Sequence, residues 1–179
     1  MALVVEDGTG LTNANAFVSV VDFKAYCDER GHVYSTYTDA VIEQAAVRST
    51  DYLSNSWPWD GFKLKERGNA AGAQALAFPR TNLTDSKGYS VASDSVPIEV
   101  VSATCEVMLI EVANPGITTP TYTPHERVKS EGVGPLKVEY DLSRTDADGA
   151  RPIMLVVKDL IGQFLVSGAG SRLQGASTR

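Results

Sequence analysis

The segment from Ile98 to Val112 carries the apolar pattern that most restricts the fold of this chain. One stripe recurs every three or four residues, as on one face of an α-helix, and consists of Ile98, Val101, Cys105, Met108 and Val112. Val100, Val107 and Ile110 lie off this stripe. A helix that is apolar on more than one face is buried on more than one side. We therefore expect a central helix, capped by Ser95 with Pro97 in its first turn, that ends at Asn114–Gly116.

Other segments also have helical signals. Ser19 is a good N-cap for a helix that stops at Gly31, and Thr38 is a good N-cap for a second helix. A last helix is expected after Pro152, with apolar residues on a helical repeat. Long stretches rich in Ser, Thr, Asp, Gly and Pro separate these helices and indicate loops. The predicted fold class is mainly α: a small helical bundle with long loops, a β-hairpin and a C-terminal helix or arm.

The predicted hairpin covers residues 128–140. Apolar and polar residues alternate strictly from Leu136 to Tyr140, which is the period of a half-buried strand, and Gly134–Pro135 supplies the turn. The strand-forming residues of this segment are Val128, Val133, Leu136, Val138 and Tyr140. Because two strands alone are marginally stable in water, we expect the hairpin to pack against another element, such as one from a neighbouring subunit.

Charge divides the chain into two parts. Residues 150–179 carry a net charge of +3, whereas the whole chain carries −6, so residues 1–149 carry −9. We divide the chain accordingly into a helical-bundle body with its hairpin (1–149) and a C-terminal helix with a Gly/Ser-rich tail (150–179). The apolar last helix has two interpretations. It docks on a partner as an arm, or it packs on the core of its own chain.

The residues that usually carry catalysis or hold metals do not form a recognisable arrangement. His32 and His125 lack the partners of a helical zinc site, and no glycine-rich phosphate loop is present. Cys27 and Cys105 are expected to be buried free thiols. No apolar segment is long enough for a membrane helix, and no signal peptide is apparent. We expect no enzymatic activity, no cofactor and no metal.

One segment offers a candidate surface for single-stranded DNA, which binds to basic grooves with aromatic platforms. Basic and aromatic residues gather there, namely Lys63, Lys65, Arg67 and Arg80 with Trp57, Trp59, Phe62 and Phe78. The alternative interpretation is that the aromatic side chains anchor the core and the basic groups are solvated. The acidic balance of the chain favours this alternative, because proteins that neutralise phosphates cluster Lys and Arg.

Four segments together resemble a family of small neck proteins of tailed bacteriophages. They are Val5–Gly10, then Asn15–Val20 with the helix that ends at Tyr26–Gly31, then Ala75–Arg80, and finally the hairpin segment. Members of that family are head–tail connector adaptors, and many carry the older label of DnaT-like single-stranded-DNA-binding proteins. The resemblance covers most of residues 3–165.

The resemblance implies a virion protein that completes the head. Such adaptors form a ring, typically of twelve subunits, below the portal protein, and they present a surface to the next neck or tail protein. Double-stranded DNA passes through the channel of the ring without specific binding. The protein would stay in the host cytoplasm before assembly and in the neck of the virion afterwards, with no membrane partner. The alternative is a DnaT-like protein that binds single-stranded DNA in phage replication.

The same resemblance indicates which residues make contacts. In such rings the C-terminal segment commonly reaches the portal, so the expected docking residues are Ile153, Val156, Leu160, Ile161, Phe164, Arg172 and Arg179. The expected contacts between subunits are made by the hairpin residues Val128, Val133, Leu136, Val138 and Tyr140.

Overall fold

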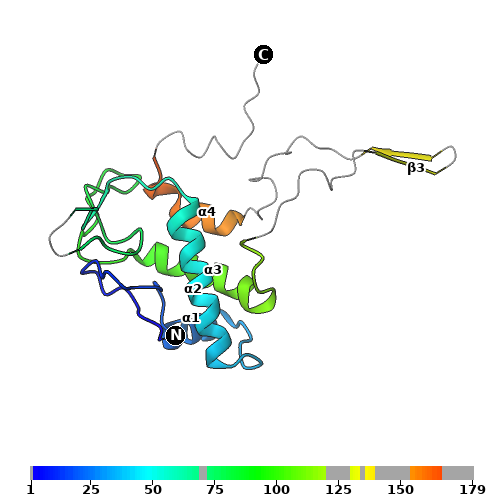
Figure 1. Ribbon diagram of the computed structural model, residues 1–179, viewed down its shortest axis with the longest axis horizontal. Helices are drawn as coiled ribbons and strands as arrows, with labels where there is room; N and C mark the ends of the chain where they lie inside the picture. The colour runs from blue at the N-terminus through cyan, green and yellow to red at the C-terminus, as the bar shows by residue number, and fades with distance from the viewer. Residues whose placement is uncertain (1, 69–71, 120–129, 134–135, 140–153, 167–179) are drawn as a thin grey trace, which may run out of the picture.

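The fold, taken from a computed structural model, is described for residues 2–68, 72–119, 130–133, 136–139 and 154–166. The helices are α1 (Val20–Arg30), α2 (Asp39–Ser56), α3 (Ile98–Ala113) and α4 (Leu155–Ile161), which continues into the 3₁₀ turn η3 (Gly162–Phe164) (Figure 1). Two antiparallel strand pairs accompany them, β1 (Phe62–Lys63) with β2 (Arg80–Thr81), and β3 (Ser130–Val133) with β4 (Leu136–Glu139). The predicted class, mainly α with long loops and a hairpin, is confirmed.

The ends of the helices follow their capping residues. The Ser19 and Thr38 hydroxyls accept hydrogen bonds from first-turn N–H groups of α1 and α2, and Gly31 ends α1 in the left-handed conformation, at φ 69°. The expected cap at Ser95 is wrong. Pro97 occupies the N-cap position of α3 and makes no side-chain hydrogen bond there. A residue with fixed φ and no N–H fits the start of a helix. The expected start of the last helix at Pro152 lies outside the described residues.

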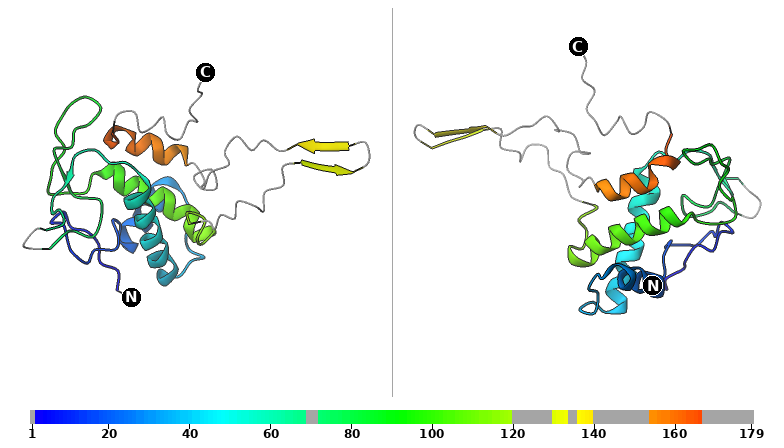
Figure 2. Two further views of the ribbon diagram at one scale, coloured as in Figure 1. Left: turned by 45° about the horizontal axis from the view of Figure 1, so that its top comes forward. Right: turned by 180° about the vertical axis from the view of Figure 1, so that it is seen from behind.

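The central helix α3 packs between α2 and α4 (Figure 2). It buries residues all along its length: Val100, Ala103, Thr104, Cys105, Val107, Met108, Glu111 and Val112. The two apolar faces expected from the sequence are therefore both used within the chain, one against α2 and one against α4. Ile98 is an exception to the predicted stripe, because it is exposed at the first turn.

The long segment between α2 and α3 is held by aromatic side chains. The rings of Trp59 and Phe78 meet edge to face with centroids 4.8 Å apart, and Phe17 contacts Phe78 with centroids 6.2 Å apart. Trp59 Nε1 donates to the Leu53 carbonyl at 3.0 Å, which ties the segment to the end of α2. The predicted anchoring roles of Trp57 and Trp59 are confirmed, since both are buried.

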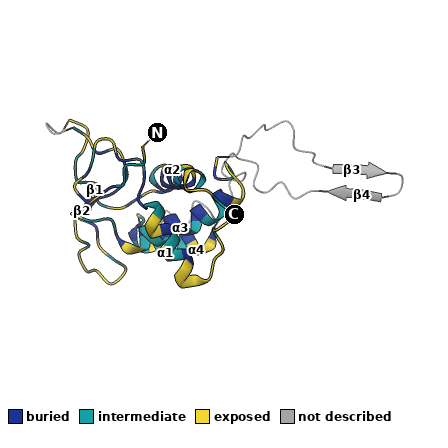
Figure 3. Cartoon of the chain, turned by 90° about the horizontal axis from the view of Figure 1, so that it is seen from below, coloured by how far each residue is buried: buried dark blue, intermediate teal, exposed yellow. Residues whose placement is uncertain are grey.

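Buried residues lie on the facing sides of the helices and in the segment that leads into β2, whereas the loop after β2 is largely exposed (Figure 3). Cys27 of α1 and Cys105 of α3 are both buried and free, as expected from the sequence. Burial raises the pKa of the Cys105 thiol to about 12 and also raises the pKa of Cys27. Both thiols are thus kept protonated and act as small apolar side chains.

Candidate functional site

The predicted hairpin is present as β3 and β4. Val133 pairs with Leu136 and Glu131 pairs with Val138, so the two strands run antiparallel directly on either side of residues 134–135. Among the described elements, the two strands contact chiefly each other, and Figures 1 and 2 draw them apart from the helices. The expected contact residues Val128 and Tyr140 lie outside the described residues. The other three, Val133, Leu136 and Val138, lie in the strands.

The expected docking residues of the last helix fall into three groups. Ile161 and Phe164 are buried in the core of their own chain, where α4 packs on α3. Val156 is 54% exposed and Leu160 is half-buried. Ile153, Arg172 and Arg179 lie outside the described residues. The burial of Ile161 and Phe164 corresponds to the core interpretation of this helix, and docking on a partner remains a prediction for its exposed residues.

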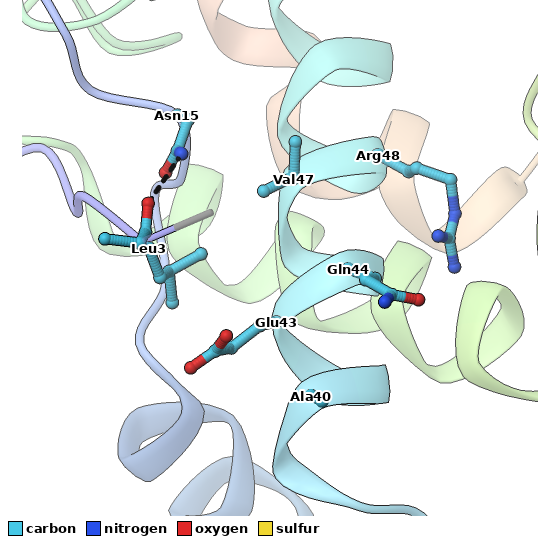
Figure 4. A pocket seen from close by; sticks show the side chains of 8 residues that line it. Leu3, Asn15, Ala40, Glu43, Gln44, Val47 and Arg48 are labelled. Carbon is cyan, nitrogen blue, oxygen red and sulfur yellow. Dashed lines mark hydrogen bonds between the residues drawn. The ribbon is translucent and has the colours of Figure 1, made fainter.

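A groove of about 420 Å³ lies between the N-terminal segment and α2 (Figure 4). Asn15 holds the N-terminal wall of this groove, since its side chain accepts from Val4 N at 2.8 Å and donates to the Ala2 carbonyl at 3.1 Å. Glu43 and Val47 of α2 point to the side on which this wall lies. The residues that line the groove are Ala2, Leu3, Asn15, Ala40, Glu43, Gln44, Val47 and Arg48.

A buried carboxylate is linked to the groove through Arg48, which is one of the lining residues. Glu111 of α3 accepts from Arg48 Nε at 2.6 Å, from Gly116 N at 2.8 Å, and from the backbone N and hydroxyl of Thr118 at 3.0 and 2.6 Å. Burial raises the pKa of this carboxyl, but the hydrogen bonds from Thr118, Arg48 and Gly116 outweigh burial and hold the pKa below its ordinary value. Glu111 therefore fastens α2 and the turn after α3 to α3.

The candidate basic and aromatic surface is only partly exposed. Arg80 is buried, and its guanidinium donates to the backbone carbonyls of Trp59, Asp60, Gly61 and Ala77 at 2.6–3.3 Å. Trp57, Trp59 and Phe78 are buried as well, and Lys65 Nζ donates to the Gly10 carbonyl at 3.2 Å. These five residues thus have structural roles. The interpretation in which the aromatic side chains anchor the core and the basic groups are solvated is therefore wrong for the guanidinium of Arg80.

Three residues of that candidate surface remain accessible. Phe62 of β1 is 62% exposed, which corrects its predicted role as a core anchor, and Arg67 is also exposed. Phe62 lies at the protein surface because β1 is two residues long and, among the described strands, pairs only with β2. Burial lowers the pKa of the Lys63 ammonium, nearby Glu66 opposes this, and the positive charges of Arg80 and Arg67 lower the pKa further. Arg67 follows Lys63 by four residues in the chain.

The model of a known protein family matches the chain. The model of the family described as "Putative DnaT-like ssDNA binding protein" matches residues 1–179. The chain belongs to this DnaT-like family. Neither the comparison with curated proteins nor the comparison with solved structures found a match.

In this DnaT-like chain, the residues that organise the loops were not predicted from the sequence. Glu6 is buried, and its carboxylate accepts from the backbone N of Gly8, Gly10 and Leu11 at 2.8–3.0 Å. These bonds hold the turn in the Val5–Gly10 segment. A signal for Glu111 was present, because it places a charge among the apolar residues of the central helix. The groove has no such signal, because its two walls are more than 20 residues apart in the sequence.

Within the described residues, His, Cys, Asp and Glu form no cluster that could hold a metal ion. No helix among them has the length and hydropathy that crossing a membrane requires.

Proposed function

We propose that this chain is a structural adaptor of the head–tail neck of a tailed bacteriophage. Copies of the chain form a ring below the portal protein, extend the DNA channel and offer a surface to the next neck or tail protein. The four segments that resemble neck adaptors motivate this proposal. The function is one of assembly geometry, and the chain acts through its surfaces.

The observation that carries the proposal is the hairpin. Its strands β3 and β4 contact chiefly each other among the described elements. A hairpin of two four-residue strands is marginally stable alone, so it gains most from pairing or packing with a further element. A neighbouring copy in a ring supplies that element. Contacts between different surfaces of identical subunits close into a ring when the rotation between copies permits it.

The charge of the chain is compatible with a DNA channel. The net charge is −6, and four of the residues that could have formed a basic and aromatic platform are buried: Trp57, Trp59, Phe78 and Arg80. Affinity for DNA arises mainly from Lys and Arg that neutralise phosphates. An acidic ring lets the genome pass without gripping it.

Electron microscopy of the purified full-length protein mixed with portal-containing heads that lack a neck tests the proposal. We expect a closed ring, of about twelve copies by the resemblance, on the portal. A variant with residues 128–140 replaced by a Gly/Ser segment of equal length should keep the circular dichroism of the helices and lose the ring. Val33→Ser, at an exposed apolar residue outside the hairpin, is the matched control and should assemble normally. A single copy per neck would refute the proposal.

A second candidate function is binding of single-stranded DNA, which the description of the family favours. Exposed Phe62, with Lys63 as its neighbour in β1 and exposed Arg67 further along the same segment, is where a base could stack beside positive charge. Titration with a single-stranded oligonucleotide separates this candidate from the adaptor.

A further inference from the structure

The outer face of α4 is more apolar than solvent contact explains. Leu155 is 68% exposed and Val156 is 54% exposed, although the same helix already buries Val157 and Ile161 against the core. Adjacent large aliphatic residues at the start of a helix form an exposed apolar patch, and such patches mark interaction surfaces when polar residues border them. Here the bordering residues are Lys158, which is half-buried, and Asp159, which is exposed.

The groove beside α2 has the complementary composition. Leu3, Ala40 and Val47 give it an apolar lining, and the small side chain of Ala40 leaves room there. Its charged residues are Glu43 and Arg48. Arg48 bonds to Glu111, whereas within the described part of the chain Glu43 forms no ion pair, and neither does Lys158 of α4. Glu43 of the groove and Lys158 of α4 are therefore opposite charges that can pair across a contact, each next to aliphatic side chains.

We propose that the outer face of α4 in one copy docks into the α2 groove of a second copy. Leu155 and Val156 enter between the N-terminal wall and α2, and Lys158 faces Glu43. The volume of about 420 Å³ is within the range of about 300–1,000 Å³ typical of sites that enclose a small ligand, so it accommodates a few aliphatic side chains.

The occupant is a second copy because of where the two surfaces lie. Within one chain, α2 and α4 pack on different sides of α3, so the groove is not filled by its own α4. A contact between two different surfaces of identical chains is heterologous, and repetition of it gives a closed ring when the geometry closes. This contact rests on the proposed adaptor function and adds a second pair of surfaces, besides the hairpin, through which the ring subunits meet.

Cysteine cross-linking of the full chain tests the contact. Ala40→Cys places a thiol in the groove and Leu155→Cys places one on α4, while the native Cys27 and Cys105 are buried and give little background. Under mild oxidation, a mixture of the two variants should give a covalent dimer that neither variant gives alone. The double variant A40C/L155C should give a ladder of higher oligomers. A mixture of Val21→Cys, at an exposed site on α1, with Leu155→Cys is the matched control and should stay monomeric.

Charge reversal then tests the pairing of Lys158 with Glu43. In the cross-linking pair, Glu43→Lys or Lys158→Glu should each lower the dimer yield by at least about tenfold, because like charges facing each other across an interface are strongly unfavourable. Combining Glu43→Lys on the groove partner with Lys158→Glu on the α4 partner should restore the yield. Asp51→Lys, an exposed acidic residue on α2 outside the groove, is the control with the same charge change and should leave the yield unchanged.

Absence of the mixed dimer, or equal yields for the Val21 and Ala40 pairs, would overturn the inference. Charge reversals without effect, or single reversals that the double reversal does not rescue, would also overturn it. Electron microscopy of heads with the wild-type protein answers the separate question of the adaptor function. A ring on the portal without the cross-link would reject this contact and retain the adaptor.

Discussion

Glu111 shows how a single residue secures the end of the central helix. Its carboxylate is fully buried and bonds to Arg48 of α2 and to Gly116 and Thr118 after α3. A buried charge of this kind is tolerated only when donors surround it. These bonds hold the turn through which the chain leaves the helical body toward the hairpin segment.

Replacing this carboxylate tests its role. Glu111→Gln removes the charge that attracts Arg48 and turns an amide N–H₂ toward groups that donate, so we expect a loss of about 2–3 kcal/mol in the free energy of unfolding. Urea denaturation followed by circular dichroism measures the loss. Glu29→Gln, at an exposed ion pair with Arg30, is the matched control and should change stability by less than about 1 kcal/mol. Equal effects of the two substitutions would contradict the assigned role of Glu111.

The same carboxylate makes stability depend on pH. The pKa of Glu111 is lower in the folded chain than its ordinary value of 4.5, so the folded state favours the charged form. Its contribution is therefore fully present above pH 4.5 and is lost as pH falls through the folded-state pKa. We expect the stability difference between wild type and Glu111→Gln to shrink below pH 4.5. A difference that is constant down to pH 3 would show that the charge is unimportant.

At the scale of elements, α4 combines core and surface functions in one short helix. We expect Phe164→Ala to lower the free energy of unfolding by about 3–5 kcal/mol, since its ring is buried and the substitution leaves a cavity. Val156→Ala, on the exposed face, should change it by less than about 0.5 kcal/mol. Thermal and urea denaturation of both variants measure this contrast. If both variants were as stable as the wild type, α4 would be a detachable arm and not part of the core.

The sequence predicted most elements and few of the contacts between them. The Ser19, Gly31 and Thr38 signals located α1 and α2, because caps act locally through the adjacent backbone. The alternation of apolar and polar residues located the hairpin, because it is also a pattern of adjacent residues. The roles of Arg80 and Phe62 were not predictable, since they depend on which distant carbonyls or strands lie beside them. The sequence pattern of an arginine beside aromatic residues is the same whether the arginine binds phosphates or the backbone of its own loops.

For the whole molecule, the distribution of charge distinguishes the two candidate functions. Residues 59–92 carry a net charge of +2 and residues 150–179 carry +3, while all other residues together carry −11. Of the basic groups in residues 59–92, Arg80 is buried against carbonyls and Lys65 donates to Gly10. The accessible positive charge near Phe62 is therefore small, and the long-range field of the chain repels a polyanion.

Nucleic-acid affinity should accordingly be weak. In fluorescence anisotropy with a labelled single-stranded oligonucleotide at about 0.15 M salt, we expect a Kd above roughly 100 µM, weaker than typical non-specific DNA binding. Phe62→Ala and Arg67→Glu should leave this value unchanged, and Tyr89→Ala, at another exposed aromatic residue, is the matched control. Sub-micromolar affinity that falls with salt and loses about 1–3 kcal/mol on Phe62→Ala alone would instead identify base stacking at β1. That result would favour the single-stranded-DNA-binding function over the adaptor.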